Sequence, residues 1–218
     1  MIKEYAFGLA NRHHFGDTND VGKYAGMAQD TFMSLWDYDA HVVDYVKEKS
    51  TLSGYDGILY MPDEFILDID GSNPENARNK TIGLTIELDD LCIPYQLYFS
   101  GTGFHIGIPG NAFRWKPCPD LHLKVKDELK ARGIYEYADS SVSDKTRIIR
   151  VVNTLNGKSK LWKIPIDSSE LHDSIDKIQT IAKTQRTNYK YNIAIKENEC
   201  EPVFDVIERK SIASDKVF

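Results

Sequence analysis

Short apolar segments alternate with polar or glycine-containing ones along the chain. Residues 63–71, DEFILDIDG, are rich in Phe, Ile and Leu and end at a glycine, which predicts a strand. Residues 95–109 predict two short strands around a glycine turn, and residues 147–166 predict a hairpin with an Asn-Gly turn. Residues 1–35 are polar and contain four glycines, so we expect loop with short helical pieces there.

Apolar spacing and helix-terminus signals together predict four helices, in residues 37–50, 72–92, 118–134 and 167–186. Asp39 suits the N-cap of the first, Pro74 suits the first turn of the second, and Gly133 ends the third. Ser168 or Ser169 suits the start of a capping box in the fourth. The order of these elements predicts an α/β or α+β domain with a mixed or antiparallel sheet.

Composition is that of an ordinary globular protein, since 41% of the 218 residues are hydrophobic and 28% are charged. The length fits one domain, with or without a small appendage. No apolar run approaches the roughly 20 residues of a membrane span, and the N-terminus lacks the apolar core of a secretion signal. Three widely spaced cysteines, Cys92, Cys118 and Cys200, predict neither a disulfide framework nor a zinc site and favour a reducing cytoplasm.

Charge is distributed unevenly along the chain. The net charge of −6 argues against a nucleic-acid partner when it is taken alone. Residues 139–166, however, hold six Lys or Arg against two Asp. A phosphate-binding face is therefore compatible with this acidic protein.

Asp68 and Asp70 stand one residue apart in the predicted strand, so their side chains project to the same face. Two carboxylates this close repel each other, and a divalent cation such as Mg²⁺ or Mn²⁺ resolves the conflict. A strand end whose acids reach solvent or meet a Lys or Arg explains the pair equally well. An EF-hand does not fit, because Asn73 stands where that loop needs glycine. Glycosyltransferases and phosphatases also use such pairs.

The segment FSGTGFHIGIPG combines glycines with a hydroxyl and an imidazole. Gly101 and Gly103 allow a ligand to approach the backbone closely, and Ser100 and His105 can hold phosphate oxygens together with exposed N–H groups. The alternative is a glycine-rich hairpin with a surface histidine. Asp139, further along, is by itself typical of a cap or turn residue before a strand.

Taken in order, these motifs resemble the archaeo-eukaryotic primase superfamily, especially the compact primase-polymerases of phages and mobile elements. FILDID is similar to that family's apolar-Asp-x-Asp/Glu motif, YFSGTGFHIGIP to its Ser…His motif, and ADSSVSDKTRIIR to its Asp ahead of an Arg-rich strand. The basic stretch of the family is matched by Arg147, Arg150, Asn153, Lys158 and KIPI. The resemblance runs from Trp36 to Arg186.

The resemblance implies a catalytic domain in residues 1–190, with an N-terminal α/β unit and a palm-like subdomain related to the RNA-recognition fold. It implies metal-dependent synthesis of primers on single-stranded DNA from NTPs or dNTPs. The implied ligands of two Mg²⁺ or Mn²⁺ ions are Asp68, Asp70 and Asp139. The residues implied to contact the nucleotide or the template backbone are Ser100, Gly101, Gly103, His105, Arg147, Arg150, Asn153, Lys158 and Lys163.

Some features of relatives are missing from the sequence. There is no Cys/His cluster and no Walker motif, so we expect neither zinc nor a fused helicase motor. The tail, residues 191–218, is a candidate docking segment for a replicative helicase or another replication protein. Two other hypotheses stay open: a catalytically inactive module that binds single-stranded nucleic acid or a replication partner, and a sugar transferase. We expect a cytoplasmic protein of phage or plasmid origin with no membrane partner.

Overall fold

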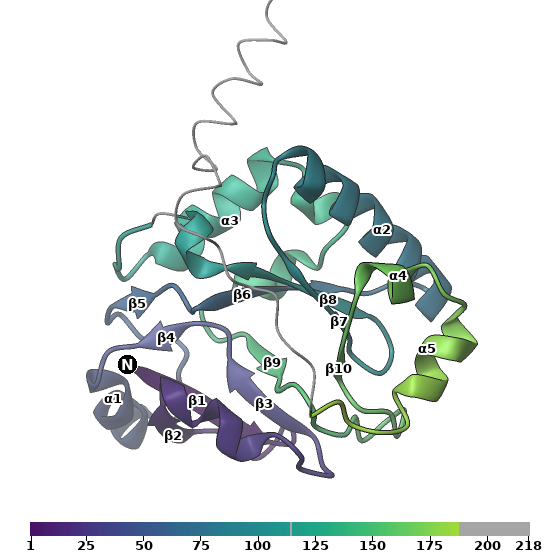
Figure 1. Cartoon of the computed structure of the whole chain (residues 1–218). Helices are drawn as coiled ribbons and strands as arrows, with labels where there is room; N and C mark the ends of the chain where they lie inside the picture. Colours follow the sequence, from purple (N-terminus) through teal and green to yellow (C-terminus); the bar gives the residue numbers. More distant parts are fainter. Residues whose placement is uncertain (114, 188–218) are drawn as a thin grey trace, which may run out of the picture.

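The computed structural model of the chain describes residues 1–113 and 115–187, and its strands form two antiparallel sheets (Figure 1). The first sheet contains β1 (Ile2–Phe7), β2 (His14–Asp17), β3 (Thr31–Ser34), β4 (Asp37–Tyr38), β5 (Leu59–Tyr60) and β9 (Ile148–Arg150). Its strand order is β5-β4-β1-β3-β9, and β2 also pairs with β1. The expected mixed α/β class is confirmed, with antiparallel sheets.

The second sheet carries the acidic strand. It consists of β6 (Glu64–Ile69), β7 (Gln96–Phe99), β8 (Phe104–Pro109) and β10 (Ile164–Ile166). Their order is β10-β7-β8-β6, with every pair antiparallel. With α2 (Pro74–Asp90) and α3 (Leu121–Ala131), these strands follow the order β-α-β-β-α-β along the chain. β9 lies between α3 and β10 in the sequence but joins the first sheet.

Helices lie around the second sheet. In Figure 1, α2 and α3 lie on one side of β6 and β8, and α4 (Ser168–Leu171) and α5 (Ile175–Ile181) lie beside β10. α2 starts at Pro74 because the side chain of Asn73 accepts a hydrogen bond from the amide of Asn76. α1 (His41–Lys49) belongs to the N-terminal half. The described part of the chain also contains the short 3₁₀ helices η1 (Thr18–Tyr24), η2 (Gly110–Phe113), η3 (Ile134–Glu136) and η4 (Ser140–Ser143).

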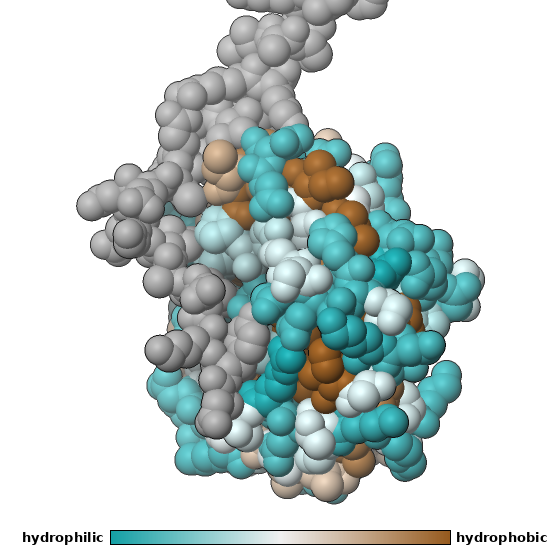
Figure 2. Space-filling model, turned by 45° about the vertical axis from the view of Figure 1, so that its right-hand side comes forward, coloured by the Kyte–Doolittle hydropathy of each residue, from teal (hydrophilic) through white to brown (hydrophobic). Residues whose placement is uncertain are grey.

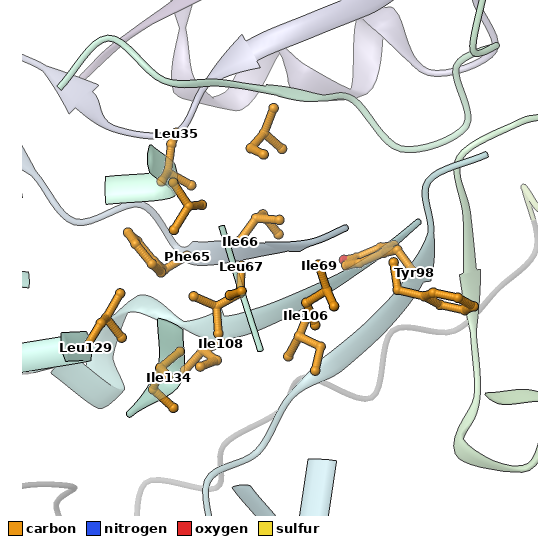
Figure 3. Packing of buried hydrophobic residues seen from close by; sticks show 14 of the residues in the cluster. Leu35, Phe65, Ile66, Leu67, Ile69, Tyr98, Ile106, Ile108, Leu129 and Ile134 are labelled. Carbon is orange, nitrogen blue, oxygen red and sulfur yellow. The ribbon is translucent and has the colours of Figure 1, made fainter. Parts of the chain in front are cut away.

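Alternation along β6 gives its two faces different partners. Figure 3 shows Ile66 on the side of Leu35, whereas Leu67 lies on the side of Leu129 and Ile134. Successive side chains of a strand point to opposite faces, so Asp68 shares the face of Ile66. Leu67 therefore lies toward α3 and η3, whereas Asp68 lies on the opposite face, toward the first sheet.

The expectation of loop in residues 1–35 is wrong, because β1, β2 and β3 lie there. β1 contains two charged residues that are buried, Lys3 and Glu4. The amine of Lys3 lies 2.6 Å from the carboxylate of Asp37, and the carboxylate of Glu4 accepts hydrogen bonds at 3.0 and 2.7 Å from Arg12. Charged residues are tolerated inside this sheet because each is paired with a distant residue.

Two further expectations need correction. Residues 147–166 do not form one continuous hairpin, because β9 pairs with β3 and β10 pairs with β7. The chain does reverse at the Asn-Gly turn, where the amide of Asn156 donates to the carbonyl oxygen of Leu161 at 2.8 Å and Leu155 and Trp162 form an isolated bridge. The helix expected in residues 167–186 is divided into α4 and α5. Its capping box is formed by Asp167 and Glu170, and the second piece starts anew at Ser174, whose side chain caps α5.

The exposed surface is mixed. The face in Figure 2 is mainly hydrophilic, with hydrophobic residues in separate groups. The exposed large hydrophobic side chains come from different parts of the chain and are Met1, Leu9, Ile58, Ile86 and Leu123. Among the described residues, no helix combines the length and the apolar character needed to span a membrane. The tail at 191–218, proposed as a docking segment, lies outside the described residues.

Candidate active site

Asp68 and Asp70 lie together at the end of β6. Asp68 is paired in register with His105 of β8, and Asp70 directly follows the strand. Nε2 of His105 lies 3.3 Å from Oδ1 of Asp68. All three side chains line one cavity. His105 is buried, so the alternative of a surface histidine on a glycine-rich hairpin does not hold.

Asp139 is attached to the same strand end through the backbone. Its amide donates a hydrogen bond to the carbonyl oxygen of Asp68 at 2.8 Å. Asp139 is also the N-cap of η4, and its carboxylate accepts hydrogen bonds from the amide and the hydroxyl of Ser141 at 2.9 and 2.7 Å. The cap role and the position beside Asp68 therefore belong to the same residue.

Arg147, which directly precedes β9, contacts two of the acids. Its Nη2 lies 2.5 Å from Oδ2 of Asp68 and 3.3 Å from Oδ2 of Asp139. Its Nη1 donates to the hydroxyl of Ser141 at 2.9 Å. The sequence predicted a phosphate contact for Arg147 but not these contacts. They place its guanidinium between Asp68 and Asp139.

The acids differ in their electrostatics. Burial raises the pKa of Asp68, but His105 and Arg147 outweigh it and bring the pKa down to about 2. Burial and the charges of Asp68 and Asp139 raise the pKa of Asp70 above its ordinary value, against a smaller opposing effect of Arg147. Burial and the charge of Lys163 lower the pKa of His105 to about 4, so its ring is neutral at pH 7.

A divalent cation needs several oxygen ligands that converge on one point. Within residues 1–113 and 115–187, no three His, Cys, Asp or Glu side chains converge closely enough to hold a metal as they stand. The donor type nevertheless fits Mg²⁺ or Mn²⁺, which prefer carboxylate oxygens. Asp70 is repelled by both neighbouring acids, and a cation would relieve that repulsion. The acids therefore fit the ion by chemistry, provided that Arg147 leaves Asp68 and Asp139.

Two adjoining cavities of about 540 and 570 Å³ open beside the acids. Asp68, Ser100, His105 and Arg147 line the first. Lys158 and the start of α2 line the second. The residues common to both are Leu9, Phe32, Asp70, Thr102, Arg150 and Asn156. The shared residues make the cavities one continuous hollow, with Asp70 in its middle.

The turn between β7 and β8 depends on its glycines for packing. The hydroxyl of Ser100 accepts a hydrogen bond from the amide of Gly103 at 3.1 Å. Gly101 has a φ of 101°, which other residues rarely adopt. A Cβ on Gly103 would lie 2.7 Å from the carbonyl oxygen of Ile69 and 2.9 Å from Oδ1 of Asp70. Gly103 thus lets the turn approach the acidic strand end, whereas a Cβ on Gly101 would meet Ser159 and Asn156. The sequence had suggested such a close backbone approach for a ligand.

Arg150 and Lys158 lie at the hollow, as their predicted role requires. Arg150 forms an ion pair with Asp30, and its guanidinium carbon lies 4.8 Å from the ring centroid of Phe32. Lys158 is exposed at the edge of the second cavity. A guanidinium over an aromatic ring and an exposed amine are both suited to phosphate contacts.

Lys163 and Asn153 lie elsewhere. Lys163 is 2% exposed, and its amine donates to the carbonyl oxygen of Arg150 at 2.8 Å and lies 4.7 Å from the ring centroid of Tyr98. The side chain of Asn153 makes two hydrogen bonds with the backbone of Arg186, at 3.0 and 2.8 Å. Neither residue lines the two cavities.

Sequence reasoning missed several lining residues. Arg12 lines the first cavity and donates to Glu4 and to the carbonyl oxygen of Thr146, next to Arg147. Asn156 is buried, and its amide donates to the carbonyl oxygen of Ser100 at 3.3 Å. The Asn-Gly signal had marked a turn at Asn156, but not its contact with the turn at Ser100.

Comparisons with protein-family models and with curated protein sequences give no match. Among solved structures, the chain is similar to the polymerase domain of Ligase D from Mycobacterium tuberculosis, in a complex with DNA. The TM-score is 0.42 and the sequence identity is 14%, over 70% of this chain and 58% of that chain. A likeness of this size says nothing about activity, so the site is interpreted from its own residues.

Proposed function

We propose that the chain is a DNA-template-dependent nucleotidyltransferase, a primase or primase-polymerase that makes or extends primers on single-stranded DNA. The observation that carries the proposal is that Asp68 and Asp70 line a hollow together with Arg147 and Arg150, and that Asp139 is joined to Asp68 through its amide. Carboxylates for cations and basic groups for phosphates are what nucleotidyl transfer requires. The order of the sequence motifs supports the same reading.

In the proposed reaction, a hydroxyl oxygen of the growing strand bonds to the α-phosphorus of an NTP or dNTP. The bond from that phosphorus to pyrophosphate breaks, and the hydroxyl proton passes to water. Asp68, Asp70 and Asp139 would hold the Mg²⁺ or Mn²⁺ ions. Bound divalent ions supply activation of the hydroxyl and neutralisation of charge on the leaving group.

The other residues have roles set by their positions. Ser100 and the neutral His105 line the first cavity and are proposed to contact phosphates, and the turn at Gly101 and Gly103 holds them there. Arg150 is proposed to bind the triphosphate, and the exposed Lys158 the triphosphate or the template backbone.

Lys163 and Asn153 are proposed as positioning residues. Lys163 donates to the carbonyl oxygen of Arg150, and Asn153 holds the segment at Arg186. Each therefore fixes the shape of the region around the hollow without touching a ligand.

The proposal extends to the organisation of the chain. Residues 1–190 would be the catalytic domain, and residues 191–218 would dock a replicative helicase or another replication protein. A cytoplasmic location and a phage or plasmid origin belong to the same proposal.

One observation favours a second candidate, a module that binds single-stranded nucleic acid without catalysis. Arg147 neutralises part of the acidic charge, since it lies within 3.3 Å of both Asp68 and Asp139. A protein that never binds cations gains stability from that pairing. Binding of single-stranded DNA with no incorporation under Mg²⁺ or Mn²⁺ would support this candidate.

The test is incorporation of a labelled nucleotide on primed and on unprimed single-stranded DNA, with NTPs and with dNTPs. We expect incorporation that requires Mg²⁺ or Mn²⁺ and is lost in Asp70→Asn. Asp90→Asn is the matched control, because Asp90 is an exposed acid at the end of α2. An active Asp70→Asn protein contradicts the proposal, and comparison of the two templates separates priming from extension.

A further inference from the structure

We propose that Arg147 competes with the divalent cation for Asp68 and Asp139, and so couples cation binding to polyphosphate binding. The inference rests on the proposed function, because it requires that the acids bind a cation. It assigns Arg147 a role beyond a phosphate contact. The guanidinium would hold the acids together in the absence of ligand and release them when a triphosphate binds.

The competition follows from the atoms involved. Nη2 of Arg147 lies 2.5 Å from Oδ2 of Asp68 and 3.3 Å from Oδ2 of Asp139. A cation held by Asp68 and Asp139 needs oxygens of the same two carboxylates. A guanidinium and a divalent cation repel each other at that range, so each weakens the binding of the other.

Arg147 also has an alternative partner within reach. Its side chain is 25% exposed, and it lines the first cavity beside Arg150. A polyphosphate in that cavity offers planar pairs of oxygens, to which guanidinium binds with two parallel hydrogen bonds. Because the coupling is reciprocal, a polyphosphate that draws Arg147 off the acids strengthens cation binding, and the cation strengthens polyphosphate binding.

Arg150 provides a matched control. It lines the same cavity and is equally charged, but its ion pair is with Asp30, and it also donates to the carbonyl oxygen of Leu155. No ion pair of the described residues joins Arg150 to Asp68 or Asp139. Removing the charge of Arg150 therefore tests the general effect of a nearby cation, whereas removing Arg147 tests the direct competition.

The experiment measures Mn²⁺ binding to the full chain by electron paramagnetic resonance, without nucleotide. Two partly buried ion pairs of this kind together correspond to about 1.4 kcal/mol, so Arg147→Gln is expected to bind Mn²⁺ about tenfold more tightly than the wild type. Arg150→Gln is expected to change the affinity by less than about twofold. Arg147→Lys keeps the charge but lacks the second nitrogen, Nη1, which holds the guanidinium in place through Ser141, and we expect an intermediate affinity.

A second arm adds inorganic triphosphate, with correction for the Mn²⁺ that triphosphate binds in buffer. We expect triphosphate to strengthen Mn²⁺ binding to the wild type, and to do so much less in Arg147→Gln, where no guanidinium remains to be released. Circular dichroism and thermal unfolding establish that each variant is folded. If Arg147→Gln does not fold, the comparison of Arg147→Lys with the wild type decides in the same direction.

The possible failures are distinguishable. Mn²⁺ binding that is unchanged or weaker in folded Arg147→Gln or Arg147→Lys, but lost in Asp70→Asn, overturns the competition and leaves the proposed function standing. Mn²⁺ binding that is the same in the wild type and in Asp70→Asn removes the acids as the cation site, and the proposed function fails with it.

Discussion

Replacing Lys163 by methionine decides whether this residue supports the fold or contacts phosphate. Lys163 is buried and lies near Glu64, a partly buried acid at the start of β6. Both oxygens of the Glu64 carboxylate lie within hydrogen-bond distance of the Tyr98 hydroxyl, at 2.8 and 2.9 Å. Lys163 supplies positive charge to this group and donates to the carbonyl oxygen of Arg150. Lys163→Met therefore leaves a partly buried carboxylate without its cation.

The expected cost combines opposing effects. Burial lowers the pKa of Lys163 from 10.5 to about 8, so keeping the amine charged inside the protein costs about 3 kcal/mol, which the methionine removes. Against this, the Glu64 carboxylate loses a favourable nearby charge and the carbonyl oxygen of Arg150 loses its charged donor, and each loss costs about 2 to 3 kcal/mol. The net loss of unfolding free energy in Lys163→Met is about 2 kcal/mol at pH 7.

Stability should also change when Glu64 is replaced alone or together with Lys163. Glu64→Gln alone removes the main favourable charge near Lys163, which keeps its hydrogen bond to the carbonyl oxygen of Arg150, and is expected to cost about 2 kcal/mol as well. The double variant removes both charges, so it should be more stable than either single variant. In Lys163→Met, the pKa of Glu64 rises further, so the native state keeps a proton that the unfolded state has lost. The deficit of Lys163→Met therefore grows as pH rises from 5 to 8.

Urea unfolding of the four proteins, followed by circular dichroism at both pH values, measures these differences. Strictly additive losses in the double variant would show that Glu64 and Lys163 are not coupled. A Lys163→Met protein with wild-type stability and weakened phosphate binding would refute the structural role and restore the phosphate contact expected from the sequence.

Three further predictions concern the neighbourhood of the acids. Gly103→Ala should lower the unfolding free energy by about 1 to 3 kcal/mol in urea, because its Cβ would lie 2.7 Å from a carbonyl oxygen; Gly22→Ala, with nothing within 4 Å of its Cβ, is the neutral control, and equal stabilities would contradict the close packing. Asn153→Ala should cost about 1 to 2 kcal/mol through its two lost hydrogen bonds to the backbone of Arg186, while triphosphate binding by the folded variant stays within about twofold of the wild type; a much larger loss of binding with little loss of stability would instead indicate a direct contact. Lowering the pH from 6.5 toward 4 should destabilise the wild type by about 3 kcal/mol through His105, since its pKa is about 4 when folded and 6.5 when unfolded, and the unfolded chain takes up the proton first; the same pH dependence in His105→Gln would exclude this cause.

The parts of the fold that local sequence specifies were predictable. β6 has the apolar residues and terminal glycine of a strand, and α2 has its Asn73 cap and Pro74 in adjacent positions. β7 and β8 are joined by a short glycine turn. In each case, the residues that decide the structure lie within a few positions of one another, so a pattern along the chain suffices.

The parts that depend on distant partners were not predictable. β1 contains Lys3 and Glu4, and only the pairing of Lys3 with Asp37 and of Glu4 with Arg12 makes their burial tolerable. The Asn-Gly signal at Asn156 indicated a hairpin, but the flanking strands pair with β3 and β7. Turn chemistry describes a reversal of the chain and carries no information on which sheet each flanking strand joins.

The candidate site also combines features that the sequence predicts with features that depend on distant partners. The pair Asp68 and Asp70 was predicted from spacing, because both lie on one strand face, whereas Asp139 was suggested only by the family resemblance. The position of Arg147 between Asp68 and Asp139 was not predicted, since it depends on how β9 lies in the first sheet next to the end of β6. A basic residue in sequence does not indicate whether its charge faces a ligand or a carboxylate.

Nucleotidyl transfer at Asp68, Asp70 and Asp139 releases pyrophosphate for each nucleotide incorporated. Pyrophosphate release during incorporation is therefore the most direct measure of the proposed reaction. Labelled nucleotide and pyrophosphate are measured together on primed single-stranded DNA with Mn²⁺, for the wild type, Asp70→Asn and Asp90→Asn. We predict one pyrophosphate per nucleotide incorporated in the wild type and in Asp90→Asn, and neither product with Asp70→Asn. DNA binding by the wild type without either product, or equal turnover by a folded Asp70→Asn, would contradict nucleotidyl transfer at these acids.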